Sequence, residues 1–233
     1  MLLSAALLVL AVAQADNPDT LYANRADPGS ADRAAALWEA RLTRDGRDFE
    51  AAWKLARACY WIGGHVPARA EGRRQYERGV EAGRRAAALE PGRPEGHFWM
   101  AANMGALAES FGLRQGLRYR GAIREALETV LRIDPAFQDG SADRALGRWY
   151  FKVPGLFGGS REKSVEHLRR SLAYNPHSTA SHYFLAETLL EMNRRAEARA
   201  ALARVLEAPV DPAWAPEDQE FKAKARTLLA TTM

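Results

Sequence analysis

Apolar and small residues recur with a helical period along almost the whole chain. Between Ala31 and Thr231 they stand three and four positions apart, separated mostly by Arg, Glu and other polar residues. Strict alternation of apolar and polar residues, which indicates a half-buried strand, is rare, and β-branched residues are sparse. Ala, Leu, Glu and Arg, which favour helices, dominate instead. The pattern therefore predicts an all-α fold.

The helical pattern is interrupted by proline after a recurring phrase. The phrases AAALEP, VLRIDP, SLAYNP and RVLEAP end at Pro91, Pro135, Pro176 and Pro209. Before each proline, small or apolar residues form a stripe along one helix face. The stripes consist of Gly79, Gly83 and Ala86; Ile123, Leu127 and Val130; Ser164, Leu168 and Ser171; and Ala198, Leu202 and Val205. Because such stripes let a second helix approach closely, each proline is expected to close one antiparallel helix pair.

This phrase resembles the second helix of the tetratricopeptide repeat (TPR), which has small residues before a closing proline. The first helices match that repeat more loosely, with Leu-Gly-like pairs at Leu55-Ala56, Ala101-Ala102, Leu146-Gly147 and Leu185-Ala186. The resemblance implies a TPR-like α-solenoid of about four degenerate repeats between Asp48 and Pro209. We expect the helical segments 31–44 and 216–230 to cap its ends, giving a single TPR-like domain over residues 31–233.

The repeats differ in length. Successive closing prolines are 44, 41 and 33 residues apart, against about 34 for an ordinary TPR unit. We expect the extra residues in the turns between paired helices. These turns would be GGHVPARAEG after Ile62, GLRQGLRYRG after Phe111 and VPGLFGGS after Lys152.

The first fifteen residues, MLLSAALLVLAVAQA, carry no charged side chain and end in the small-x-small motif Ala13-Gln14-Ala15. This pattern predicts a cleaved signal peptide over residues 1–15, followed by a flexible mature N-terminus over residues 16–30. Asp16, and no lipobox cysteine, follows the cleavage motif, so we expect a soluble periplasmic or secreted protein. The alternative is a cytoplasmic scaffold in which the same residues form an uncleaved, buried helix.

Several classes of chemistry find no support in the residues. Cys59 is the only cysteine, which excludes an internal disulfide and a cysteine-based zinc cluster. The sequence contains no HExxH, GxSxG or GK[ST] motif. The net charge of +4 rests on arginines that fit solvated helix faces, and an exported protein has little access to nucleic acid. We therefore expect no enzymatic activity, metal, cofactor or nucleic-acid partner.

The segment WYFKVPGLFGGS, residues 149–160, joins three aromatic residues to a glycine-rich turn. Ser160 is well placed to cap the following helix, with Glu162 in its first turn. The alternative is an anion-binding loop, because free N–H groups at a helix start attract anions. The candidates for such a loop are Gly158, Gly159 and Ser160.

TPR proteins bind partners on the concave face, which is lined by the first helix of each repeat. Transferred onto this chain, the lining positions are Trp53, Arg57, Trp99, Asn103, Arg144, Arg148, Tyr183 and Glu187. Aromatic rings and guanidinium groups are typical of recognition surfaces. The alternative is that Trp53 and Trp99 belong to the core between repeats.

A narrower resemblance lies in Lys152-Val153-Pro154-Gly155, Phe157-Gly158-Gly159-Ser160 and the helix REKSVEHLRRSLAYNP. Together these segments resemble the TatT family, the periplasmic TPR proteins associated with TRAP transporters. The resemblance implies pairing with the solute-binding subunit of such a transporter, homo-oligomerisation, and a channel or pocket for a small organic acid. Our leading hypothesis is a protein-interaction adaptor. The alternative is a small-ligand carrier whose pocket is covered by the 149–160 turn.

Overall fold

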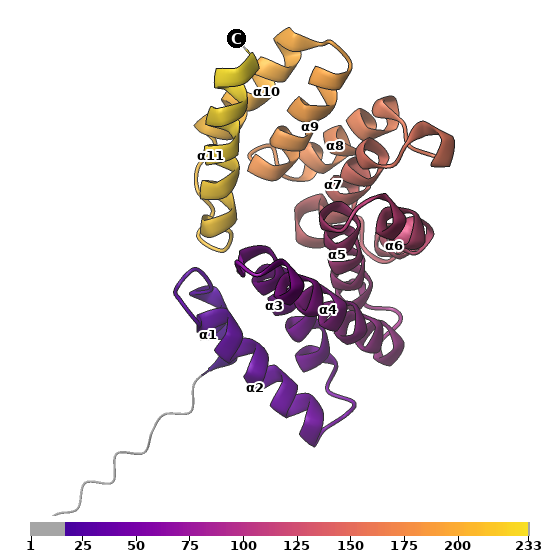
Figure 1. Cartoon of the computed structure of the whole chain (residues 1–233), viewed down its shortest axis with the longest axis vertical. Helices are drawn as coiled ribbons and strands as arrows, with labels where there is room; N and C mark the ends of the chain where they lie inside the picture. Colours follow the sequence, from indigo (N-terminus) through magenta and orange to yellow (C-terminus); the bar gives the residue numbers. More distant parts are fainter. Residues whose placement is uncertain (1–16, 233) are drawn as a thin grey trace, which may run out of the picture.

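The computed structural model describes residues 17–232, and within this range it contains eleven α-helices, one short 3-10 helix and no strand (Figure 1). The predicted all-α fold is confirmed. The predicted signal peptide over residues 1–15 lies outside the described residues.

The helices follow one another with short connections. Their bounds are α1 (Pro18–Ala23), α2 (Ser30–Arg44), α3 (Phe49–His65), α4 (Arg69–Leu89), α5 (Pro94–Ser110), α6 (Leu113–Ile133), α7 (Phe137–Lys152), η1 (Gly155–Phe157), α8 (Arg161–Tyr174), α9 (Thr179–Glu191), α10 (Arg195–Glu207) and α11 (Ala215–Thr232).

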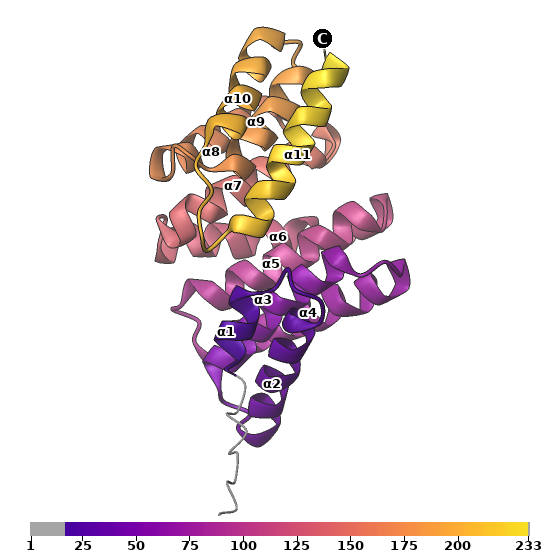
Figure 2. The ribbon, with the colours of Figure 1, turned by 90° about the vertical axis from the view of Figure 1, so that its left-hand side faces the viewer.

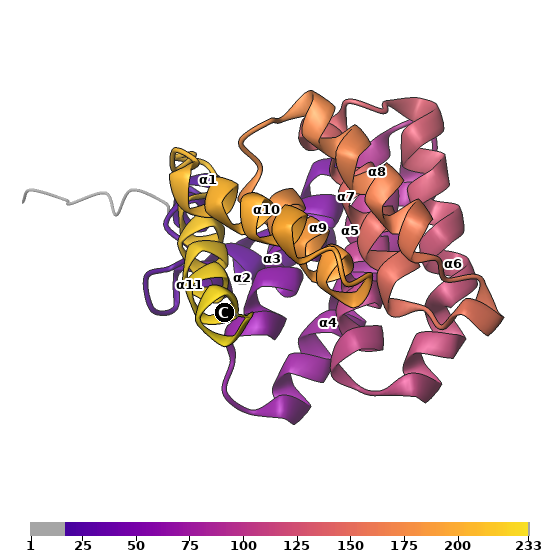
Figure 3. The ribbon, with the colours of Figure 1, turned by 90° about the horizontal axis from the view of Figure 1, so that it is seen from above.

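Four antiparallel pairs form the body of the molecule: α3 with α4, α5 with α6, α7 with α8, and α9 with α10. The first helices of the pairs also contact one another in the order α3, α5, α7, α9, and α11 continues this layer by packing on α9. Figure 3 shows α6 and α8 outside α5 and α7, on the side away from α11. This layering is the TPR-like solenoid that the closing prolines predict.

The predicted stripes lie at helix–helix contacts, both within and between the pairs. Leu127, Leu168 and Leu202 are at most 1% exposed, and the small residues allow close helix contacts. A Cβ atom on Gly83 would lie 2.7 Å from the backbone nitrogen of Met100 in α5. The small residues of α4 are therefore required by the distance between α4 and α5.

Two of the three turns expected to hold the extra residues are helical instead. The segment GLRQGLRYRG belongs almost entirely to α6, which begins at Leu113, and α4 begins at Arg69 within GGHVPARAEG. The first of these segments contains no proline, and its Leu, Arg and Gln residues favour a helix, which explains why α6 extends so far towards its N-terminus. Only VPGLFGGS forms a long turn, which contains η1.

The expectation of a flexible segment over residues 16–30 is corrected for its described part. Asn17 caps α1 by accepting hydrogen bonds from the backbone N–H groups of Asp19 and Thr20. Tyr22 is 6% exposed, and its ring centroid lies 5.9 Å from that of Trp38 in α2. The N-terminal residues are therefore anchored to the first capping helix.

The C-terminal helix returns towards the N-terminal helices. Figures 1 and 2 show the first turn of α11 close to α1 and α3, although about 150 residues separate α3 from α11 along the chain. Among residues 17–232, no helix combines the length and the apolar character that a membrane span requires.

Candidate functional site

The accessible polar and aromatic side chains of the inner helix layer form the candidate site. We call this surface the inner face and define it by Trp53, Arg57 and Tyr60 of α3, Arg144 and Arg148 of α7, and Tyr183 of α9. These residues share the layer because α3, α5, α7 and α9 contact one another through consecutive repeats.

Arg57 lies in an aromatic environment at the N-terminal end of the inner face. Its guanidinium carbon lies 4.1 Å from the ring centroid of Tyr22 and 5.0 Å from that of Trp53. Desolvation by these neighbours lowers the pKa of Arg57 below its ordinary value. No carboxylate among residues 17–232 forms an ion pair with it. Aromatic rings thus form the close contacts of this charge, while Asp19 and Glu217 interact with it from further away.

Tyr60 and Arg144 occupy the middle of the inner face. Tyr60 is 42% exposed, yet the surrounding protein desolvates its hydroxyl and raises its pKa to about 12. Desolvation likewise lowers the pKa of Arg144, whose charge interacts with Tyr60 and Asp139 without an ion pair or hydrogen bond in the described part of the chain.

Arg148, one turn further along α7, is fully paired. Its guanidinium donates hydrogen bonds to both carboxylate oxygens of Glu109 in α5, at 3.1 and 2.9 Å. A third bond of 2.6 Å reaches Glu187 in α9. Although desolvation opposes it, these two carboxylates raise the pKa of Arg148. Arg148 therefore joins three repeats rather than offering a free cation.

Two predicted site residues lie in the core. Trp99 is 3% exposed and Asn103 is fully buried. The Asn103 amide donates to the carbonyl oxygens of Ala56, at 2.9 Å, and Trp99, at 2.8 Å. It packs against Gly79, where a Cβ atom would lie 2.2 Å from its Oδ1 atom. The prediction that Asn103 faces a partner is corrected, because its amide is used to join α5 to α3.

The remaining predicted residues sit closer to the surface. Tyr183 is half-buried, and its ring centroid lies 5.6 Å from that of Phe221 in α11. Trp53 is also half-buried against the core. The structure thus brings together two subsets of the predicted row: Trp53 with Arg57, and Arg148 with Glu187.

Several buried donors near the N-terminal end of the inner face lack an acceptor. Within the described residues, these are the indole Nε1 atoms of Trp38, Trp53 and Trp99 and the Nε atom of Arg57. All four groups are donors, and buried donors without acceptors are rare because each costs about 1–3 kcal/mol. The buried Oδ1 atom of Asn103 also lacks a partner, but it is an acceptor. Because Trp38 and Trp99 are at most 3% exposed, only the donors of Trp53 and Arg57 match a ligand that carries acceptors, such as a carboxylate.

Contacts between α11 and the N-terminal helices, which we call the clasp, close the inner face on one side. Arg25 is 5% exposed and forms a bidentate ion pair with Glu217. It also donates to the carbonyl oxygen of Ala213 at 2.8 Å. Trp61 supports Arg25 by donating to its carbonyl oxygen at 3.0 Å. The clasp thus joins the start of α11 to the N-terminal helices.

His65 forms the second contact of the clasp. Its Nε2 atom lies 2.6 Å from Glu220 of α11, and its ring stacks on Trp61 with centroids 3.6 Å apart. The hydrogen bond that the protonated ring donates to the Glu220 carboxylate raises the pKa of His65. The sequence did not predict the clasp, because no motif links residues that are 155 to 192 positions apart. It also did not predict Tyr60 as a site residue.

The loop candidates Gly158, Gly159 and Ser160 are engaged in the local structure. The Ser160 hydroxyl accepts a hydrogen bond from the backbone N–H of Lys163, so the predicted helix cap is confirmed. Gly158 has φ of +100°, and a Cβ atom on Gly159 would lie 1.7 Å from the Val153 carbonyl oxygen. Both glycines are therefore explained by the shape of the turn.

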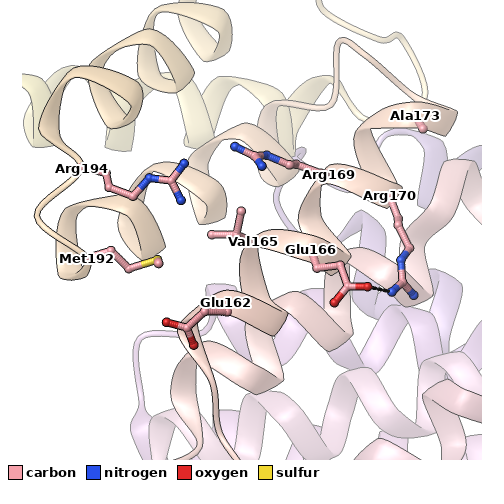
Figure 4. Close-up of a pocket in the computed structure, with 8 residues that line it drawn as sticks. All are labelled: Glu162, Val165, Glu166, Arg169, Arg170, Ala173, Met192 and Arg194. Atoms are coloured by element: carbon pink, nitrogen blue, oxygen red, sulfur yellow. Dashed lines mark hydrogen bonds and ion pairs between the residues drawn. The ribbon is translucent and has the colours of Figure 1, made fainter.

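A separate cavity of about 560 Å³ lies between α8 and the start of α10 (Figure 4). Its charged lining residues pair with carboxylates: Arg170 with Glu166, and Arg169 and Arg194 with Glu197. Because its arginines are already neutralised, this cavity is a weaker site for an anion than the inner face. No group of three metal-ligating side chains occurs among residues 17–232.

Known structures share the fold of this chain. The crystal structure of TTC0263, a thermophilic TPR protein of Thermus thermophilus, is similar with a TM-score of 0.69 and 25% identity, covering 92% of this chain and 98% of that chain. A crystal structure of MamA is similar with a TM-score of 0.55 and 17% identity, covering 90% of this chain and 98% of that chain. The structure of MamA 41-end from Desulfovibrio magneticus RS-1 is similar with a TM-score of 0.55 and 18% identity, covering 83% of this chain and 96% of that chain. No curated protein matches the chain.

Two family models match the sequence itself. The model of regulator of microtubule dynamics protein 1-3 matches residues 15–157, and the model of the TRAP transporter T-component matches residues 94–232. Each covers more than half of the chain, and the second contains the 149–160 turn. The chain therefore belongs to the TRAP transporter T-component family, within the TPR superfamily, and its first part also belongs to the family of regulators of microtubule dynamics.

Proposed function

We propose that this protein is a non-catalytic, exported adaptor that binds the solute-binding subunit of a TRAP transporter through its inner face. Membership of the TRAP transporter T-component family supports the transporter context. The TPR-like layering supports recognition of a protein partner by the first helices of the repeats. Export through residues 1–15 predicts a mature chain that starts at Asp16, which N-terminal sequencing checks.

The observation that carries the proposal is the unpaired Arg144 beside the exposed Tyr60. A guanidinium that is desolvated without a counter-ion is unfavourable in the free protein. A carboxylate from a partner would neutralise it and form a bidentate, charge-assisted contact. Tyr60 supplies aromatic area and a hydroxyl next to the same cation.

The test is a binding titration with the purified solute-binding subunit of the same organism. Replacing Arg144 with Gln removes the charge, and we expect affinity to fall by a factor of roughly 10 to 100, as for loss of one charged contact at an interface. Arg195→Gln, on the outer helix α10, is the matched control and keeps wild-type affinity. A wild-type protein that shows no binding, or an Arg144 variant that binds equally well, contradicts the proposal.

A second candidate is a carrier of a small carboxylate ligand, favoured by the unpaired donors of Trp53 and Arg57. The clasp narrows access to this end of the inner face, which suits a small ligand better than a folded domain. Native mass spectrometry of the purified protein distinguishes the two functions. A bound organic acid that is lost in Arg57→Gln supports the carrier, and an empty wild-type protein that still binds the subunit supports the adaptor.

A further inference from the structure

The most exposed apolar side chain is far from the clasp. Among the described large hydrophobic residues, Leu156 is 90% exposed, and its neighbour Phe157 is 36% exposed. Both lie in η1, within the turn between α7 and α8. Figures 1 and 3 show α6 and α8 on the side of the molecule opposite α11, so this surface is separate from the inner face. We call Leu156 and Phe157 the tip.

The tip is held outward by a hydrogen-bonded turn. The backbone N–H of Ser160 donates to the carbonyl oxygen of Tyr150 at 3.0 Å, which closes the base of the turn. Within the turn, the N–H of Gly159 donates to the carbonyl oxygen of Pro154 at 3.2 Å. Trp149 fixes the turn to α6 by donating from Nε1 to the Arg120 carbonyl oxygen at 2.9 Å. The exposure of Leu156 is thus built into the fold.

Arg120 is the cation that lies against the tip, because Arg124, Lys152 and Arg161 pair with Glu128, Glu109 and Glu191. Residues 112–124, at the start of α6, contain four arginines and no acidic residue, and residues 149–161 contain Lys152 and Arg161 and no acidic residue. The guanidinium carbon of Arg120 lies 5.4 Å from the ring centroid of Phe157. No carboxylate of the described chain forms an ion pair with Arg120.

A cleft of about 340 Å³ lies directly beside the tip. Arg120, Arg124, Trp149 and Phe157 line it, and Glu125 and Glu128 lie at the same cleft. Arg124 is paired with Glu128 at 2.8 Å, so Arg120 is the cation available to a ligand. The cleft is large enough for a phosphate group, and it places the Arg120 cation next to the apolar ring of Phe157.

We propose that the tip docks on an anionic lipid surface. An apolar side chain that protrudes beside a cation can enter the boundary between head groups and acyl chains, while the cation contacts a lipid phosphate. Leu156 supplies the inserted side chain, and Arg120 supplies the phosphate contact. A protruding tip fits a deformable lipid surface better than a groove on a folded protein. Docking here leaves the inner face on the opposite side accessible.

The test is co-sedimentation of the full chain with vesicles of phosphatidylcholine alone and of phosphatidylcholine mixed with phosphatidylglycerol. We expect binding to the mixed vesicles, weakened by salt, and little binding to the neutral ones. Leu156→Ser should weaken binding roughly tenfold, because the variant has no exposed apolar side chain to bury at this position. Arg120→Gln should weaken it several-fold, as expected for one basic residue near the membrane surface.

Two variants serve as matched controls, and both should bind like wild type. Val210→Ser removes an apolar side chain that is 37% exposed in the segment between α10 and α11. Arg195→Gln removes one charge from α10. The proposal is overturned if wild type ignores the mixed vesicles at low salt, or if Leu156→Ser binds them equally well. It is also overturned if Leu156→Ser changes only the oligomeric state, which would assign the tip to contacts between copies of the chain.

Discussion

Arg144 and Arg148 lie one turn apart on α7, but they differ in their partners. Arg148 donates to Glu109 and Glu187 and joins the second, third and fourth repeats. Arg144 is desolvated without a carboxylate partner in the described chain. The clasp residue Arg25 resembles Arg148, because it is buried and paired with a carboxylate, that of Glu217. Arg57 resembles Arg144, because it is desolvated and lies against an aromatic ring without an ion pair in the described chain.

The comparison separates arginines that stabilise the fold from arginines that are available for binding. A buried ion pair whose carboxylate is provided by the chain itself is already satisfied, and breaking it leaves the partner's charge buried and uncompensated. A desolvated cation without a carboxylate costs stability and gains from any anion that binds. Substitutions at the two kinds of site should therefore change stability in opposite directions.

The largest effect is expected for Arg25→Met. The substitution leaves Glu217 without its cation and removes the bond to the Ala213 carbonyl, so the clasp opens. We expect the free energy of unfolding to fall by about 3 kcal/mol, as for a buried pair with one partner removed. Urea unfolding followed by circular dichroism measures it. Arg195→Met is the control, and an Arg25 variant as stable as that control would show that the Arg25 contacts of the clasp do not stabilise the fold.

A smaller loss is expected when Glu109 and Glu187 are both replaced with Gln. Arg148 then loses both carboxylates, but its ion pairs are partly solvated, with side-chain exposures of 18% for Arg148, 36% for Glu109 and 23% for Glu187. We expect a decrease of about 1–2 kcal/mol in the free energy of unfolding. If Arg148→Met restores the stability of the double variant, the loss comes from the uncompensated charge; no recovery would argue against that cause.

Arg144→Met should change the free energy of unfolding in the opposite direction. Removing a desolvated cation that has no counter-ion should leave the free energy of unfolding unchanged or raise it by up to about 1 kcal/mol. The same urea measurement checks this, with Arg148→Met as the contrasting variant one turn away. A clear loss of stability in Arg144→Met would mean that its guanidinium is satisfied in the fold, and the distinction between the two arginines would fail.

The smallest effect concerns the pH dependence of the clasp. The hydrogen bond between His65 and Glu220 raises the pKa of His65 above 6.5 and lowers the pKa of Glu220 below 4.5. The pair therefore stabilises the fold fully between about pH 4.5 and 6.5. Stability decreases at higher pH as His65 loses its proton and at lower pH as Glu220 gains one.

An NMR titration of the His65 ring measures this shift. In Glu220→Gln the pKa of His65 should fall towards its ordinary value, whereas Glu166→Gln, on α8, should leave it unchanged. An equal pKa of His65 in wild type and Glu220→Gln would show that His65 and Glu220 form no ion pair in the clasp.

The candidate site was only partly predictable from the sequence. The row of first-helix positions placed Arg57, Arg144 and Arg148 in one helix layer, because the helical period shows which residues share a face. It could not tell that Asn103 turns into the core, since that depends on Gly79 leaving space for its amide. Nor could it separate Arg148 from Arg144, because Glu109 lies outside the row and reaches Arg148 across 39 residues.

The repeat architecture was determined by the sequence itself. Local helical preference, the small or apolar stripes and the closing prolines act within some forty residues, so each helix pair can be recognised from its own segment. Only the tertiary structure decided the clasp, the unpaired cations and the exposed Leu156. Those features depend on the superhelical path that brings α11 to α1 and α3, and this path is the sum of packing angles that no single segment encodes.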